Sequence, residues 1–210
     1  MLLLAFDTAT PAITVAVHDG TSVVAQAGGE GATAHGEQLA PAIREALAQA
    51  GLVPADLTDV AVGVGPGPFT GLRVGVVTAL TLGATLGLRT HGVCTLDVLA
   101  AEAATDLDEE FLVATDARRR EVYWGRYAAD GRRLEGPAVD LPAAVAQRFA
   151  GLPVVGRGAD VHAGVLGGSR GPIDPSAAAL ATAVVAEAVE ILPLEPLYLR
   201  RPDAVPIDQR

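Results

Sequence analysis

"GVGPGPFTGLRVGVVTALTLG", residues 63–83, joins a glycine- and proline-rich turn to a long apolar run, and it decides how the first half of the chain folds. The apolar residues 59–64 that lead into it predict a buried strand. Gly67 suits the N-cap of a following helix, and Pro68 suits its first turn, where the missing N–H of proline costs nothing. The stretch therefore predicts a strand, a sharp turn and a helix over residues 69–88.

Small residues recur at every fourth position of that helix. The strip consists of Gly71, Gly75, Ala79 and Gly83, and it continues to Gly87. Glycine inside a helix costs about 0.5–1 kcal/mol relative to alanine, so the strip needs a compensating contact. Because such a strip lets another backbone come close, two interpretations are open: packing within this chain, or packing on a helix of another protein. Our hypothesis is the intermolecular contact.

Apolar runs and alternation predict three strands and a helix before this stretch. The strands cover residues 2–6, 13–17 and 23–27, the first ending at Asp7, and the helix covers residues 38–50. The order of strands and helices is typical of an α/β protein.

The second half of the chain opens in a similar way, with "FLVATDARRREVYWGRYAADG" at residues 111–131. Aligning the halves places Asp116 on Asp7 and Val122 on Ile13, which indicates either duplicated units or a coincidence between two ordinary strand pairs. The polar stretch around residues 100–110 marks the expected boundary between two domains, 1–103 and 104–210.

Composition excludes several functional classes. The chain has 210 residues, of which 50% are hydrophobic, and a formal net charge of −10, so it can fold around real cores but should repel RNA as a direct ligand. Every basic residue is arginine, which excludes a phosphate-binding or Schiff-base lysine. The N-terminus lacks a basic signal-peptide start, and the uncharged stretch 74–88 is shorter than the roughly 18–20 residues that cross a bilayer. With the single Cys94, these features predict a cytoplasmic protein without membrane contact.

Catalytic patterns are sparse. His18, His35, His91 and His162 show no metal-ligand spacing, so we expect no metal site. The serine motif "GGSRG" at residues 167–171 is followed by prolines where a helix should begin, and we interpret it as accidental.

Three features leave alternatives open. Asp7 and Asp116 end predicted strands, where carboxylates often hold Mg²⁺ beside nucleotide phosphates, but a turn or capping role is at least equally favoured. The glycine-rich turn opens a helix, where phosphate can bind, yet no Lys-Ser/Thr follows it. The run Arg118, Arg119 and Arg120 predicts a solvated turn, with contact to an acidic partner or RNA as the alternative.

Five blocks, taken together and in this order, resemble the bacterial TsaB (YeaZ) family. They are "LAFDTAT" at residues 4–10, "HGEQLAPAI" at 35–43, "GVGPGPFTGLRVGV" at 63–76, "TDAR" with "EVYW" at 115–124, and "EPLYLR" at 195–200. The resemblance spans nearly the whole chain. It implies two actin-like, ribonuclease-H-like (ASKHA) domains with mixed sheets flanked by helices.

The resemblance also implies a role in making threonylcarbamoyladenosine in tRNAs that read codons beginning with A. In that machinery TsaB is a non-catalytic dimerisation subunit that pairs with the transferase TsaD, while the ATPase TsaE joins the pair. The implied interface uses the two helices at about residues 35–50 and 69–88. Its candidate residues are His35, Gln38, Leu39, Ile43, Phe69, Thr70, Gly71, Leu72, Arg73, Gly75, Val76, Ala79 and Gly83.

A departure from TsaD supports the non-catalytic interpretation. By our alignment, Thr95 and Leu99 occupy the two histidine places of the metal-binding H-x-x-x-H of TsaD, and neither side chain binds metal as imidazole does. We therefore predict an accessory subunit that binds TsaD and meets tRNA only through the complex. A homodimer of the lone chain and ATP or ADP at the partner interface are left open. The alternative is an ATP-dependent phosphotransferase or ATPase of the actin-like superfamily, with Asp7 and Thr8 as nucleotide contacts beside the turn at residues 65–71.

Overall fold

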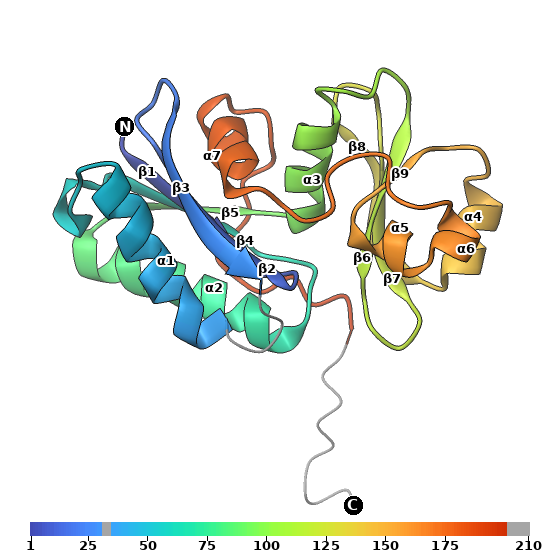
Figure 1. Ribbon diagram of the computed structural model, residues 1–210, viewed down its shortest axis with the longest axis horizontal. Helices are drawn as coiled ribbons and strands as arrows, with labels where there is room; N and C mark the ends of the chain where they lie inside the picture. The colour runs from blue at the N-terminus through green and yellow to red at the C-terminus, as the bar shows by residue number, and fades with distance from the viewer. Residues whose placement is uncertain (31–34, 201–210) are drawn as a thin grey trace, which may run out of the picture.

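The first half of the chain forms a five-stranded mixed sheet with the order β3-β2-β1-β4-β5 (Figure 1). The computed structural model describes residues 1–30 and 35–200. β1 pairs antiparallel with β2 and parallel with β4. The strands of this sheet are β1 (Leu3–Asp7), β2 (Ala12–His18), β3 (Val23–Glu30), β4 (Asp59–Gly63) and β5 (Arg89–Val93).

The second half forms a four-stranded sheet with the order β8-β7-β6-β9. β6 pairs antiparallel with β7 and parallel with β9, which repeats the arrangement around β1. The strands are β6 (Phe111–Asp116), β7 (Val122–Tyr127), β8 (Arg133–Asp140) and β9 (Val154–Val155).

Helices cover both faces of each sheet (Figure 1). On the first sheet, α1 and α2 lie side by side on one face, where Leu39 and Val76 pack with Phe6, and α7 covers the other, where Leu180 packs with Leu3. On the second sheet, α3 packs on one face and α4, α5 and α6 lie on the other. The helices are α1 (His35–Gln49), α2 (Phe69–Leu86), α3 (Thr95–Ala103), α4 (Pro142–Arg148), α5 (Arg157–Val161), α6 (Ala163–Leu166) and α7 (Ala177–Val185), with a short 3₁₀ turn η1 (Pro54–Asp56).

The expected division into residues 1–103 and 104–210 needs one correction. α7 comes from the second range but packs on β1 and β2 of the first sheet. The segment after α7 continues along the first half, where Leu192 exchanges backbone hydrogen bonds with Gly92 and the N–H of Leu197 donates to the carbonyl of Val64. The chain therefore returns to its first sheet, because the apolar side of α7 covers a face that α1 and α2 leave open.

Most predicted elements agree with the structure. The strands expected at residues 2–6, 13–17, 23–27 and 59–64 and the two helices appear within a few residues of their expected ends. Two mixed sheets flanked by helices are confirmed, whereas the relation to actin remains a prediction. Among the described helices, α2 alone is long and apolar enough to cross a membrane. This is weak evidence for a membrane span, because α2 packs on the first sheet.

Candidate functional site

The small-residue strip of α2 lies directly on the first sheet. The hydroxyl of Thr8, just after β1, donates to the carbonyl of Gly71 at 2.8 Å. A Cβ added to Gly75 would lie 2.5 Å from Thr8 Oγ1, and one added to Gly83 would lie 2.6 Å from Thr90 Cγ2. No side chain fits in these gaps, so the glycines allow α2 to approach its own strands.

This packing corrects the hypothesis that the strip forms an intermolecular face. Gly71, Gly75, Ala79 and Gly83 are all buried within the chain. Because α2 is apolar on every side, its residue pattern does not indicate which face of the helix is buried. The compensation that the glycines require comes from contact with β4, β5 and the residue after β1.

The other candidate interface residues divide by exposure. Gln38, Thr70 and Arg73 are exposed and Phe69 is half-buried, whereas the side chain of His35 lies outside the described part of the chain. The buried ones, which belong to the chain's own packing, are Leu39, Ile43, Leu72 and Val76.

The exposed face of α2 carries apolar residues that sequence reasoning missed. Val77 and Leu80 are 58% and 47% exposed, and Ala84 follows on the same face. Arg73 is the only charged residue of the helix. Exposed positions recur every three or four residues from Thr70 to Ala84, but valine, leucine and alanine occupy this face as they do the buried one, so the sequence carries no signal that separates them.

Arg73 is held in place at one end of this face. Its Nε donates to the hydroxyl of Tyr198 at 2.7 Å, and its guanidinium lies 5.4 Å from the ring centre of Phe69. The rings of Phe69 and Tyr198 are themselves 4.8 Å apart. The family-like blocks around residues 69 and 198 thus meet in space, which fixes the rim of the exposed face.

Asp7 is fully buried and bonded to protein groups. Its Oδ1 accepts the N–H of Ala9 at 2.7 Å, and its Oδ2 accepts the hydroxyl of Thr95 at 2.8 Å. Burial raises the pKa of Asp7 to about 6, although these hydrogen bonds oppose the shift. The carboxylate therefore ties β1 to the start of α3.

The two positions aligned with the histidines of TsaD are occupied by packed side chains. Thr95 is fully buried. Its hydroxyl donates to Asp7 and also accepts the N–H of Gly65 at 3.2 Å. Leu99 is fully buried beside Phe111 in the core under the second sheet. The described residues hold no group of three or more His, Cys, Asp or Glu side chains placed to bind a metal.

Two small cavities lie where the ends of β1 and β6 face each other. One has a volume of about 120 Å³ and is lined by Thr8, Thr70 and Arg118, among others. The second holds only about 10 Å³ and is lined by Thr115, Asp116 and Arg118, among others. Pockets for small-molecule ligands are typically about 300–1,000 Å³, so neither is large enough for a nucleotide.

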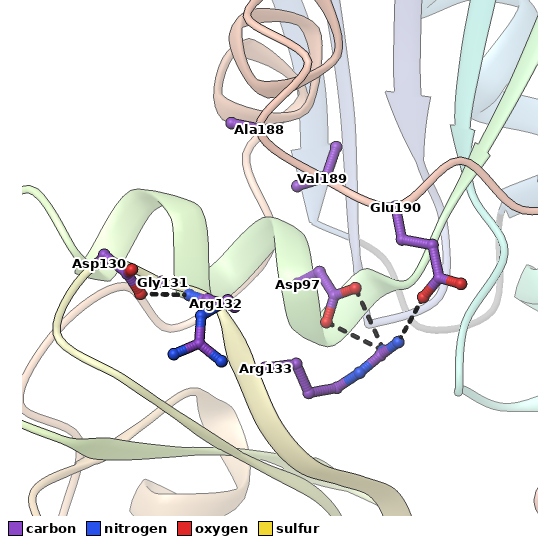
Figure 2. Close-up of a pocket in the computed structure, with 8 residues that line it drawn as sticks. All are labelled: Asp97, Asp130, Gly131, Arg132, Arg133, Ala188, Val189 and Glu190. Atoms are coloured by element: carbon purple, nitrogen blue, oxygen red, sulfur yellow. Dashed lines mark hydrogen bonds and ion pairs between the residues drawn. The ribbon is translucent and has the colours of Figure 1, made fainter.

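A further cavity of about 370 Å³ lies between α3, the turn before β8 and the segment after α7 (Figure 2). Arg133 donates to both oxygens of Asp97 at 3.1 Å and to Glu190 at 2.8 Å, and the Tyr127 hydroxyl donates to Asp97 at 2.8 Å. Burial raises the pKa of Asp97 despite the opposing charge of Arg133. Asp97 of α3, Arg133 of β8 and Glu190 after α7 pair with one another across three segments, so they connect the two halves of the chain.

Comparisons with known proteins give the names TsaD for the matching family model and TsaB or YeaZ for relatives and solved structures. The family model "TsaD: tRNA N6-adenosine threonylcarbamoyltransferase" matches residues 17–192. TsaB of Escherichia coli, named as a tRNA threonylcarbamoyladenosine biosynthesis protein, is 37% identical over 71% of this chain and 66% of its own length. The structure of YeaZ from Pseudomonas aeruginosa superimposes with a TM-score of 0.78 at 28% identity, covering 94% of this chain and 99% of YeaZ.

Mycobacterial relatives are more similar in sequence. An uncharacterized protein of Mycobacterium tuberculosis is 46% identical over 98% of this chain and 94% of its own length. A Mycobacterium leprae relative is also 46% identical, but the chain spans only 56% of that longer protein.

Proposed function

Because the chain belongs to the TsaB (YeaZ) family, we propose that it is a non-catalytic subunit that binds and activates the transferase TsaD in tRNA threonylcarbamoyladenosine formation. The proposed docking surface is the exposed face of α2 with the neighbouring exposed residues of α1. In this proposal the ATPase TsaE joins the pair, tRNA is met only through the complex, and the complex works in the cytoplasm.

The exposed face of α2 is the observation that carries this proposal. Val77 and Leu80 present apolar side chains to solvent on a helix whose only charge is Arg73. Apolar area without charge is typical of the core of a protein interface, with polar groups at its rim. Gln38 and Arg44 on the exposed side of α1 would supply such a rim.

Three features support a non-catalytic role. Thr95 and Leu99 stand where TsaD places metal-binding histidines, and both are packed into the protein. Asp7, the carboxylate that the alternative kinase or ATPase function would use, is enclosed by its bonds to Ala9 and Thr95. The cavity beside Thr8 is too small for ATP. Steady ATP turnover by the isolated chain with Mg²⁺ would contradict this assignment.

The proposal leaves two points of assembly for experiment. The same apolar face could pair two copies of this chain when TsaD is absent, and ATP or ADP could bind where the two proteins meet. Sedimentation of the lone chain at several concentrations, with and without nucleotide, measures both.

Leu80→Glu tests the docking surface. A charge buried in the contact should weaken association with TsaD by roughly tenfold to hundredfold, because about 1.4 kcal/mol corresponds to each factor of ten. The melting temperature of the isolated chain should hardly change, since Leu80 is half exposed. Analytical ultracentrifugation with TsaD and a tRNA modification assay give the two readouts.

Val165→Glu is the matched control, because Val165 is 50% exposed on α6 in the second half of the chain. It should bind TsaD as the unmodified chain does. Normal TsaD binding by Leu80→Glu would contradict the proposed surface.

A further inference from the structure

Arg73 lies at one end of the exposed apolar face of α2. It is exposed, and it is the only charged residue of the helix. Its Nε donates to the hydroxyl of Tyr198 at 2.7 Å. Its guanidinium also lies 5.4 Å from the ring centre of Phe69 and 5.7 Å from that of Tyr198. Two aromatic side chains therefore hold this exposed cation in one orientation.

The terminal nitrogens of the Arg73 guanidinium have no use within the described part of the chain. Among the described residues, Arg73 forms no ion pair, and its side chain makes one hydrogen bond, the one from Nε. Other arginines pair with carboxylates of this chain, among them Arg89, Arg126, Arg133, Arg148 and Arg157. The N–H groups of a guanidinium match both oxygens of a carboxylate, so an oriented arginine without such a partner is suited to receive one from outside.

The surface next to this arginine is apolar. Tyr198 borders a groove of about 360 Å³ that Val64 and Leu197 also line, with Glu195 as its one charged lining residue. On the other side, the exposed face of α2 carries valine, leucine and alanine. Apolar contact of this kind is typical of a protein partner, whereas an RNA backbone would meet a chain with a net charge of −10. These surroundings favour a protein carboxylate over a phosphate as the counterpart of Arg73.

We infer that Arg73 binds a carboxylate of the partner that docks on α2, an aspartate or glutamate side chain of TsaD at the rim of the contact. Phe69 and Tyr198 are positioning residues, because they restrict the rotamers of Arg73 before the partner arrives. The inference rests on the proposed function for the identity of the partner. It adds the charge that the partner must present at this end of α2, and a partner without that charge would leave the arginine unpaired in the contact.

The first experiment compares Arg73→Ala with Arg170→Ala, which removes the same charge from an exposed residue in the second half of the chain. Association with TsaD is measured by analytical ultracentrifugation, after melting temperatures have shown that both variants fold. Arg73→Ala should bind roughly tenfold to hundredfold more weakly, whereas Arg170→Ala should bind as the unmodified chain does. The loss should shrink between about 150 and about 500 mM salt, because salt screens a rim charge pair.

Arg73→Lys keeps the charge and guards against a loss that comes only from misfolding. It should bind roughly three- to tenfold more weakly than the unmodified chain, because lysine lacks the planar fork and the Nε bond to Tyr198.

Tyr198→Phe tests the positioning role, since it keeps the ring and removes the hydroxyl that orients Nε. It should weaken TsaD binding roughly two- to fivefold in the unmodified chain. In the Arg73→Ala background the same change should have no effect, because the group that it orients is gone. An equal loss in both backgrounds would mean that Tyr198 does not act through Arg73.

Charge reversal identifies the carboxylate. Arg73→Glu should bind TsaD more weakly than Arg73→Ala, because two carboxylates then meet. Acidic surface residues of TsaD are changed to arginine one at a time. One of these changes should restore binding to Arg73→Glu by at least roughly tenfold and weaken binding to the unmodified chain and to Arg170→Glu.

Equal TsaD affinity for Arg73→Ala and Arg170→Ala would overturn the inference and leave the proposed function standing, as would a scan of TsaD in which no reversal restores binding. Normal TsaD affinity of Arg73→Ala with weaker tRNA binding by the assembled complex would also overturn it, since Arg73 would then be a phosphate contact. Failure of the unmodified chain to bind TsaD would overturn both the proposed function and the inference.

Discussion

The two halves of the molecule repeat one strand arrangement but use the end of its first strand differently. In each half, three antiparallel strands are followed by a strand that pairs parallel with the first: β3-β2-β1-β4 and β8-β7-β6-β9. β1 ends at Asp7 and β6 ends at Asp116. Asp7 is fully buried, whereas the side chain of Asp116 is 17% exposed.

The groups packed on each aspartate explain this difference. In the first half, Asp7 follows Leu3 and Ala5 on the face of the sheet that α7 and α3 cover, and its Oδ2 accepts the hydroxyl of Thr95 at the start of α3. In the second half, the carboxylate of Asp116 accepts the N–H of Arg118 in an exposed loop, so it keeps contact with solvent. The lesson is that a repeated strand order does not repeat the chemistry of its ends, because burial depends on what packs over them.

Gly75→Leu is the change expected to disturb the first half most. Even a Cβ would lie 2.5 Å from Thr8 Oγ1, so leucine must push α2 away from β1 and β4. We expect a loss of at least about 3 kcal/mol in the free energy of unfolding, at the upper end of overpacking effects. Denaturant unfolding of the isolated chain measures it.

Ala84→Leu is the control for Gly75→Leu, because Ala84 is exposed on the same helix. Its free energy of unfolding should stay within about 0.5 kcal/mol of the value for the unmodified chain. Equal stability of the two variants would mean that the strip does not pack tightly on the sheet.

Asp7→Asn tests the buried state of the first aspartate through pH. The pKa of Asp7 is raised from 3.8 to about 6, so the folded chain binds more protons than the unfolded chain between these values. Stability from this group is therefore complete below about pH 4 and is lost as pH rises through about 6. Asparagine does not titrate, so the stability of the unmodified chain relative to Asp7→Asn should fall by up to about 3 kcal/mol over this range.

Urea unfolding at pH 4, 5, 6 and 7 gives this comparison. If the difference in the free energy of unfolding between the two proteins does not change with pH, Asp7 is solvated. That result would remove the contrast between the halves.

Asp116→Asn should have the smallest effect. Asparagine keeps an oxygen for the N–H of Arg118 and loses only an ion pair whose arginine is 59% exposed. Exposed ion pairs contribute about 0–1 kcal/mol, and we expect the free energy of unfolding, measured with urea at about pH 7, to change within that range. A much larger loss of stability would instead indicate that the second half encloses its aspartate as the first half does.

The sequence by itself determined the local elements and several site residues. Strand and helix periodicity is set by neighbouring residues, so the elements from β1 to α2 could be placed within a few residues of their ends. The glycine-rich turn, the aspartates at the strand ends and the exposed arginine run were also readable, because each depends on residue type at a short spacing.

Only the tertiary structure decided how these pieces face one another. Gly75 can pack on a strand or on a foreign helix, and its contact with Thr8 depends on a residue 67 positions earlier in the chain. The bond between Asp7 and Thr95 spans 88 positions, and the burial that raises the pKa of Asp7 comes from that enclosure. Likewise, α7 returns to the first sheet because a face there is left uncovered, which no local pattern records. Such outcomes depend on which surfaces come into contact, because that contact, and not any single stretch of sequence, sets desolvation and packing.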